Sequence, residues 1–241
     1  LFKPANKLQA AIGRVAVISD GAHAFGSVKN GVKAGAIADF TSFSFHAVKN
    51  LTTAEGGALA WRNIDGVDND ELYHELQLYS LHGQSKDALS KNKAGAWEYD
   101  VVYPAYKCNM TNINAAIGIA QLERYEGLLE RRRVLNERYE AALEKLGIKV
   151  MHHYTDEMTS TGHLYLVRIP GASVDDRNAV IQEMAEREIA CNVHYKPLPM
   201  MTAYKNLGFD IADYLPRRCC HVDFGALQSS IMVELKNVSF R

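Results

Sequence analysis

The hydrophobic positions of the first sixty residues fall into short runs that are separated by turn residues. Runs at 15–19, 40–45 and 57–61 predict three strands, and the first is continuous, as in a strand buried on both faces of a parallel sheet. A helix over 6–12 precedes them and ends at Gly13. Short strands with turn-rich connections are typical of the edge of a mixed α/β sheet.

Helical spacing dominates the next eighty residues. We expect helices over 68–81, 111–125 and 126–146, the last of them long, amphipathic and closed by Gly147. Residue Thr111 or Asn112 caps the second of these helices. The polar, lysine-rich stretch 83–99 is predicted to be an exposed, mobile loop. We place a domain boundary at the end of the long helix, which gives a large domain, 1–147, and a small one, 148–241.

The small domain has the pattern of strand, strand, helix and strand, over 148–151, 164–169, 175–188 and 190–194. This order predicts an α+β domain. The tail 215–241 is atypical, because it has no clear periodicity, and 222–240 is ambiguous between helix and coil.

Composition excludes several classes of function. The 241-residue chain has a formal net charge of -1, which gives no support for nucleic-acid binding, although a phosphate-bearing small molecule still fits. No apolar run is long enough to cross a membrane. The first four residues do not indicate a signal peptide, because no apolar stretch follows them. Its four cysteines have no metal-binding spacing and are interpreted as reduced thiols. We therefore expect a cytoplasmic protein without a metal.

Two residues at predicted strand ends have complementary chemistry. Asp20 follows the first strand and Lys49 follows the second, just before the paired glycines Gly56 and Gly57. A carboxylate and an amine so placed suit a cofactor with a basic ring nitrogen and a carbonyl group, because burial favours the uncharged, nucleophilic amine. Each residue also has an ordinary interpretation: Asp20 as the cap of a turn, and Lys49 as a solvated surface amine.

Longer blocks around these residues resemble a known family. The blocks are SDGAHAFG (19–26), FSFHAVKNLTTAEGG (43–57), YKCNMT (106–111), AAIG (115–118) and QL (121–122). In order and spacing they resemble the pyridoxal-phosphate-dependent nucleotide-sugar aminotransferases of the DegT/DnrJ/EryC1/StrS type. The resemblance covers about 15–213. It implies part of a fold-type-I large domain with a mixed, mostly parallel sheet, followed by the small domain.

The resemblance also implies roles for individual residues. Lys49 would form the Schiff base with pyridoxal 5'-phosphate and act as the acid and base, and Asp20 would pair with the ring nitrogen. The other implied cofactor contacts are Ala22 on the ring face, His23 near the phenolic oxygen, Ser44 at the phosphate, and Asn109 at the phosphate of a neighbouring subunit. A shared phosphate site implies a homodimer. On the substrate side, His194 and Tyr195 are candidates for sugar or nucleotide contacts, or simply for a strand leading into an X-Pro turn.

The implied reaction moves an amine from an amino acid, such as glutamate, to a nucleotide-linked keto sugar in surface polysaccharide biosynthesis. Two alternatives remain at this point. In the family's sugar dehydratases a histidine replaces the Schiff-base lysine, so Lys49 argues against that activity. Because family members begin well upstream of Leu1, a catalytically inactive member that binds a nucleotide sugar or a partner subunit is the other alternative.

Overall fold

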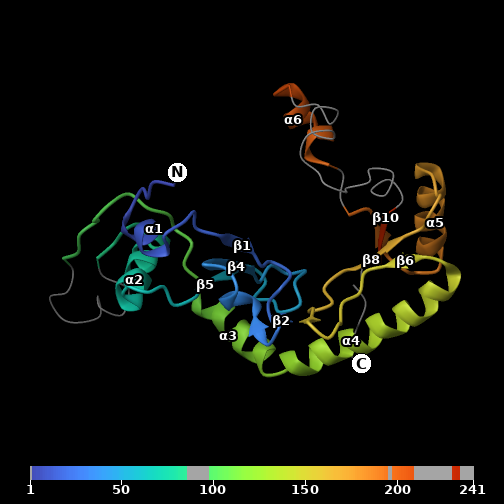
Figure 1. Cartoon of the computed structure of the whole chain (residues 1–241), viewed down its shortest axis with the longest axis horizontal. Helices are drawn as coiled ribbons and strands as arrows, with labels where there is room; N and C mark the ends of the chain where they lie inside the picture. Colours follow the sequence, from blue (N-terminus) through green and yellow to red (C-terminus); the bar gives the residue numbers. More distant parts are fainter. Residues whose placement is uncertain (1, 86–97, 195–196, 209–229, 234–241) are drawn as a thin grey trace. The chain divides into compact units, whose positions relative to one another are not determined.

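The computed structural model of the chain describes residues 2–85, 98–194, 197–208 and 230–233. Contacts divide the chain into two compact units, Leu1–Glu126 and Gly127–Arg241, whose elements are labelled in Figure 1. The long helix α4 (Tyr125–Leu143) begins at this division and belongs almost wholly to the second unit. The boundary that we predict at the far end of this helix, near Gly147, stays a prediction.

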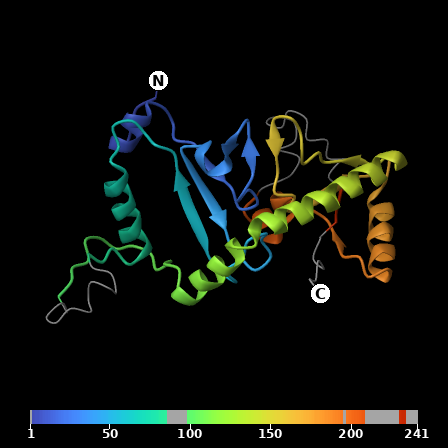
Figure 2. The ribbon, with the colours of Figure 1, turned by 90° about the horizontal axis from the view of Figure 1, so that it is seen from below.

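The first unit is built on a mixed three-stranded sheet in the order β1-β4-β5 (Figure 2). Strand β1 (Ile18–Asp20) runs parallel to β4 (Phe40–Ser44), and β4 runs antiparallel to β5 (Gly57–Trp61). Two of the three predicted strands therefore lie within one residue of their predicted bounds. Asp20 pairs with Ser42, and Ser44 pairs with Gly57.

Helices and a hairpin complete the first unit. They are α1 (Lys7–Ile12), β2 (Val28–Lys29), β3 (Val32–Lys33), the 3₁₀ turn η1 (Ala34–Ala36), α2 (Asn69–Ser80) and α3 (Asn112–Leu122). All three helices have the side-chain cap that their sequences favour, from Asn6, Asp68 and Thr111. Thr111 is thus the cap of α3. Residues 86–97 of the predicted polar loop lie outside the described residues.

Two apolar clusters hold the first unit together. Phe40, Ile64 and Leu72 are buried where α1 and α2 pack on the sheet. At the other end of β4, the ring of Phe25 lies 5.3 Å from the ring of Phe45 in an edge-to-face arrangement, and its carbonyl accepts a 2.5 Å hydrogen bond from the Tyr125 hydroxyl. Because these clusters lie at opposite ends of β4, they fix the direction of this strand.

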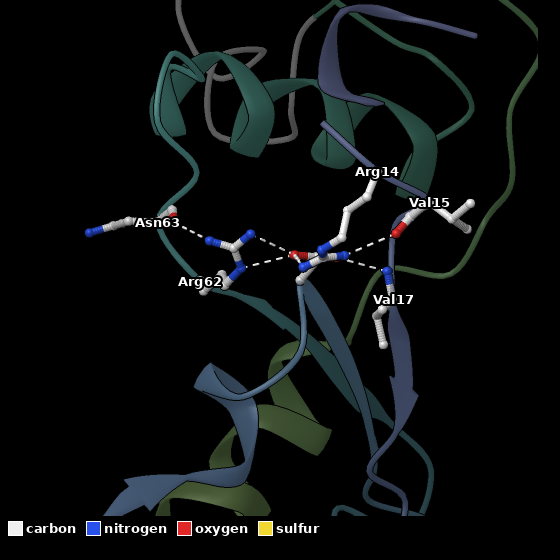
Figure 3. A network of polar contacts seen from close by, with 6 residues as sticks. Arg14, Val15, Val17, Arg62 and Asn63 are labelled. Carbon is white, nitrogen blue, oxygen red and sulfur yellow. Dashed lines mark hydrogen bonds and ion pairs between the residues drawn. The ribbon is translucent and has the colours of Figure 1, made fainter. Parts of the chain in front are cut away.

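A buried carboxylate joins three segments at the start of β4 (Figure 3). Asp39 is fully buried and accepts hydrogen bonds from Arg14 at 2.6 and 2.9 Å, from Arg62 Nε at 2.9 Å and from the Val17 N–H at 2.8 Å. The Arg14 guanidinium and the Val17 N–H hold the pKa of this carboxyl well below its usual range. Asp39 therefore fixes both neighbours of β4, the chain before β1 and the end of β5.

The prediction of a buried first strand is wrong in both its bounds and its burial. Only Ile18–Asp20 pairs as a strand, and the side chains of Val15, Val17 and Ile18 are exposed by 67%, 51% and 70%. The physical reason is that β1 is an edge strand, paired only with β4 among the described residues, and no described element covers its outer side. A continuous apolar run indicates that other elements must cover the strand, but it does not identify those elements.

The second unit contains a small antiparallel sheet in the order β6-β8-β10-β9 and the helices beside it. Its elements after α4 are η3 (Glu144–Leu146), β6 (Lys149–Val150), β7 (Met158–Thr159), β8 (Tyr165–Arg168), α5 (Val174–Glu186), β9 (Cys191–Asn192), η4 (Leu198–Met200), α6 (Thr202–Asn206) and β10 (Ser230–Val233). As predicted, Gly147 closes the long helical segment, with a left-handed φ of 72°.

One strand of this sheet was not predicted. We expected helix or coil over 222–240, whereas β10 pairs antiparallel with both β8 and β9. Three apolar residues follow Ser230 in β10, a run that is too short to show a period, so only pairing with distant strands determines their conformation. In the part of the chain that the structure describes, no helix is long and apolar enough to span a membrane.

Candidate active site

The parallel pairing of β1 with β4 brings two predicted site residues to one edge of the sheet. Asp20 is the last residue of β1 and Ser44 the last of β4, and the carboxyl ends of parallel strands share an edge. The Asp20 side chain is exposed, and its Oδ1 accepts a 3.0 Å hydrogen bond from the Ala22 N–H. One carboxylate oxygen thus caps the following turn, while the carboxylate still faces solvent at the sheet edge.

Residues 21–24 form that turn. The Ala24 N–H donates to the Gly21 carbonyl at 2.8 Å, so Ala22 and His23 are the two central residues of the turn directly after Asp20. The side chain of His23 is exposed, and that of Ala22 is half-buried. Both predicted cofactor contacts therefore lie beside Asp20.

Gly21 is a site residue that the sequence analysis missed. Its N–H donates to the Ser42 carbonyl at 2.8 Å, and a Cβ at this position would lie 2.6 Å from Thr41 Cγ2. Only glycine lets the chain leave β1 this close to β4. The Asp-Gly pair at 20–21 was the available signal.

Lys49 lies in a loop, 45–56, that is closed on itself after β4. The Phe45 N–H donates to the Gly56 carbonyl at 2.8 Å, and the Thr53 N–H donates to the Phe45 carbonyl at 2.9 Å. Within this loop the Lys49 N–H donates to the His46 carbonyl at 2.9 Å, which makes a tight turn at 46–49. The Lys49 side chain is half-buried.

Two exposed side chains, His46 and Glu55, lie close together at the base of the loop. His46 Nε2 lies 3.6 Å from Glu55 Oε1, and the His46 N–H donates to Ser44 Oγ at 3.3 Å. Ser44 therefore holds the first residue of the Lys49 turn as well as lying at the end of β4.

Asn109 comes from a separate segment that runs from α2 to α3. The Cys108 N–H donates to the Ser80 carbonyl at 2.9 Å, and Asn109 Oδ1 accepts a hydrogen bond from Lys107 Nζ. The Asn109 side chain is exposed. This arrangement leaves Asn109 on the surface of the first unit, where a group of another molecule has access to it.

Sequence comparison shows to which family these residues belong. The profile of the DegT/DnrJ/EryC1/StrS aminotransferase family matches residues 5–225. The chain belongs to this family. The match includes every block on which the resemblance was based, and it extends beyond them at both ends.

Two relatives illustrate the membership of this DegT-family chain. The putative sugar aminotransferase Spr1654 from Streptococcus pneumoniae, solved in its PMP form, is 50% identical with a TM-score of 0.88 over 97% of this chain and 57% of that chain. The spore coat polysaccharide biosynthesis protein SpsC of Bacillus subtilis (strain 168) is 33% identical over 82% of this chain and 50% of its own length. The predicted fold, part of a fold-type-I transferase, is thereby confirmed.

The DegT-family chain spans about half the length of the relatives that it matches. A further solved form of Spr1654, described as its PLP form, is 48% identical with a TM-score of 0.86. We therefore attribute the ligands and reactions of the complete relatives to those proteins alone.

Of the predicted substrate-side residues, His194 lies in the second unit, after β9, and Tyr195 lies outside the described residues. The His194 side chain is half-buried, and this burial lowers its pKa. The neutral imidazole is thus favoured. Its role toward a substrate stays a prediction.

The second unit also contains a histidine arrangement that the sequence did not reveal. His152 Nδ1 lies 2.6 Å from Glu140 Oε1 on α4, and the ligand-type atoms of Glu140, Glu144 and His152 all lie within 4.8 Å of one another. The hydrogen bond and ion pair with Glu140 raise the pKa of His152.

Proposed function

We propose that the protein to which this chain belongs is a pyridoxal-phosphate-dependent sugar aminotransferase. The observation that carries the proposal is that a carboxylate and a hydroxyl, Asp20 and Ser44, end two parallel strands, and that an amine, Lys49, lies in the loop that follows the second strand. This donor set fits the cofactor's ring nitrogen, phosphate and aldehyde respectively. Gly21, which has no space for a Cβ, lets the backbone after Asp20 run close to β4.

Each of these residues has a defined proposed role, and Lys49 has two. Asp20, which faces solvent, holds a proton on the ring nitrogen by its negative charge. Ser44 Oγ donates to the phosphate. The half-buried Lys49 Nζ first binds the aldehyde and then moves the proton released from the amine-bearing carbon of the substrate. The chemistry that the bound cofactor supplies is an electron sink for that carbon.

The proposed overall reaction balances without another reagent. An amino acid, which we propose is glutamate, gives up its amine, takes an oxygen from water and becomes a 2-oxo acid. A keto sugar releases its carbonyl oxygen as water, takes the amine and becomes an amino sugar, so the two waters cancel. We propose a nucleotide-linked sugar and a role in surface polysaccharide biosynthesis. SpsC, named for spore coat polysaccharide biosynthesis, supports that setting.

We further propose a cytoplasmic homodimer. The support for two shared sites is Asn109, whose exposed position on the first unit suits contact with the phosphate held by a second subunit.

An absorbance experiment tests the assignment of Lys49. Purified protein is mixed with pyridoxal phosphate, and the band of the lysine adduct is recorded before and after borohydride reduction, which fixes the label for peptide mapping. We expect a band in the parent chain and in Lys29→Ala, a surface-lysine control, and none in Lys49→Ala. Labelling of other lysines with equal yield in Lys49→Ala would contradict the assignment.

One observation favours a second candidate, an inactive chain that binds a nucleotide sugar or a partner subunit. β1 and the residues before it carry exposed apolar side chains, among them Ile18 and Val15, to which a partner has access. For this candidate the chain shows no adduct band with pyridoxal phosphate but binds a nucleotide sugar in calorimetry.

A further inference from the structure

We propose that Asn114 is a positioning residue for Lys49, an inference that rests on the proposed function. Asn114 lies in the first turn of α3, far from Lys49 in the sequence. Its Nδ2 donates to the Thr53 carbonyl at 2.6 Å and to the Glu55 carbonyl at 3.0 Å. One side chain thus holds two carbonyls of the loop that carries Lys49.

The carboxamide of Asn114 is itself oriented by the helix cap. The Asn114 N–H donates to Thr111 Oγ1 at 3.2 Å, and the Thr111 hydroxyl also bonds Asn114 Oδ1. Because Oδ1 accepts from this hydroxyl, both hydrogens of Nδ2 are left for the loop. The opposite orientation would put Oδ1 against two carbonyl oxygens, so the network allows one orientation only.

The held carbonyls flank a strained residue. Ala54 lies between Thr53 and Glu55 and has a φ of 66°, a left-handed conformation that a residue with a Cβ disfavours. Such a conformation persists only where its surroundings determine it. The Thr53 side chain, 1% exposed, donates to the Glu55 carbonyl at 2.8 Å and shares this task with Asn114.

These contacts reach Lys49 through the hydrogen bond that closes its loop. The Thr53 N–H donates to the Phe45 carbonyl, and the turn with Lys49 lies between these two residues. If Thr53 and Ala54 leave their conformation, this bond opens and the position of Lys49 relative to the end of β4 is no longer fixed.

The close approach of α3 to the loop is supported independently by Gly118. This residue lies one turn after Asn114, and a Cβ on it would lie 2.9 Å from Thr53 Cγ2. A small residue at 118 therefore lets Asn114 reach the loop. Since α3 begins at Asn112, three residues after Asn109, the hydrogen bonds of Asn114 also tie the Lys49 loop to the segment of the second proposed phosphate contact.

The first test needs no cofactor. Amide hydrogen exchange of residues 45–57 is measured in the parent chain, in Asn114→Ala, in Asn114→Asp and in the exposed control Asn112→Ala. We expect exchange at Phe45 and Thr53 to rise about tenfold or more in both Asn114 variants, because two hydrogen bonds to the loop are lost. Exchange in α2 should stay unchanged, which separates local opening from failure to fold.

The second test uses pyridoxal phosphate with borohydride trapping. Both Asn114 variants should trap the cofactor at Lys49 more slowly, and the pH midpoint of the adduct band should shift, whereas Asn112→Ala should match the parent chain. Unchanged exchange over 45–57 in Asn114→Ala, or an unchanged trapping rate and pH midpoint, overturns the proposal. If the parent chain does not label Lys49, the proposed function fails, and the exchange result still decides whether Asn114 holds the loop.

Discussion

Replacing Asp39 by asparagine tests the polar anchor at the start of β4. Each oxygen of the Asp39 carboxylate accepts from at least two donors: Oδ2 from Arg14 and the Val17 N–H, and Oδ1 from Arg14 and Arg62. In either orientation the NH₂ group of an asparagine would face only donors. The variant thus loses a buried negative charge and leaves donors that face residue 39 without an acceptor.

The expected cost follows from the number and burial of these contacts. Charge-assisted hydrogen bonds contribute about 1.5–3 kcal/mol each, but the Arg14 and Arg62 side chains are 51% and 35% exposed, so water replaces part of what they lose. We expect the free energy of unfolding to fall by about 3 kcal/mol, which lowers Tm by about 6–12 °C for a chain of this size.

Urea unfolding followed by tryptophan fluorescence measures this change. Trp61 packs against the cluster around Phe40 and precedes Arg62, so in a Trp97→Phe background the fluorescence reports on this cluster of the first unit. The matched control is Asp65→Asn, which removes an exposed carboxylate from the same unit.

The loss should also depend on pH with a definite sign. Because the pKa of Asp39 is lowered in the folded state, its contribution is full above the usual carboxyl pKa of 3.8 and is lost as pH falls below that value. The gap between the parent chain and Asp39→Asn should therefore be constant near neutral pH and shrink below about pH 4. A gap under about 0.5 kcal/mol at pH 7, the range of ordinary surface substitutions, would refute the reasoning.

Two further predictions concern the sheet edge and the second unit. Gly21→Ala should lower the unfolding free energy by about 1–3 kcal/mol because its Cβ overlaps Thr41, whereas Gly127→Ala, in open space on α4, should raise it by up to about 1 kcal/mol; urea titration compares the two. The adjacent histidines should titrate in opposite senses. The ion pair with Glu140 raises the pKa of His152, so its contribution is full below 6.5 and is lost as pH rises, whereas burial lowers the pKa of His153, whose contribution is full above 6.5 and is lost as pH falls. Circular dichroism of His152→Gln and His153→Gln during urea unfolding from pH 5 to 8 checks both, and parallel pH profiles in the two variants would contradict them.

The features that could be predicted from the sequence are those with local signals. Thr111 was one of two predicted caps of α3, Gly147 ends the α4 segment as predicted, and the run 40–45 becomes β4 within one residue. The placement of Asp20 at the end of the first strand follows from the same kind of local pattern. Caps, periods and turns act over a few residues, so a single sequence contains them.

The contacts that could not be predicted from the sequence join residues that are far apart in it. Asp39 binds Arg14 and Arg62, which are 25 and 23 residues away, and Asn114 holds Thr53 across 61 residues. Nothing in the residue types near Asp39 or Asn114 specifies these partners, because the contacts arise only when strands and helices have packed. The exposure of Ile18 has the same origin, since burial depends on an element that local pattern does not identify.

The order of strands in the second unit has a consequence for the time course of its folding. Strand β10 lies between β8 and β9, and residues 169–229 separate it from β8 in the sequence. On a ribosome β8 and β9 emerge first, yet the strand that joins them follows only at 230–233. Until then the edges of β8 and β9 that will pair with β10 stay unpaired. The sheet therefore cannot be completed during translation from its early strands alone. Its completion depends on contacts of high contact order, between residues far apart in the sequence.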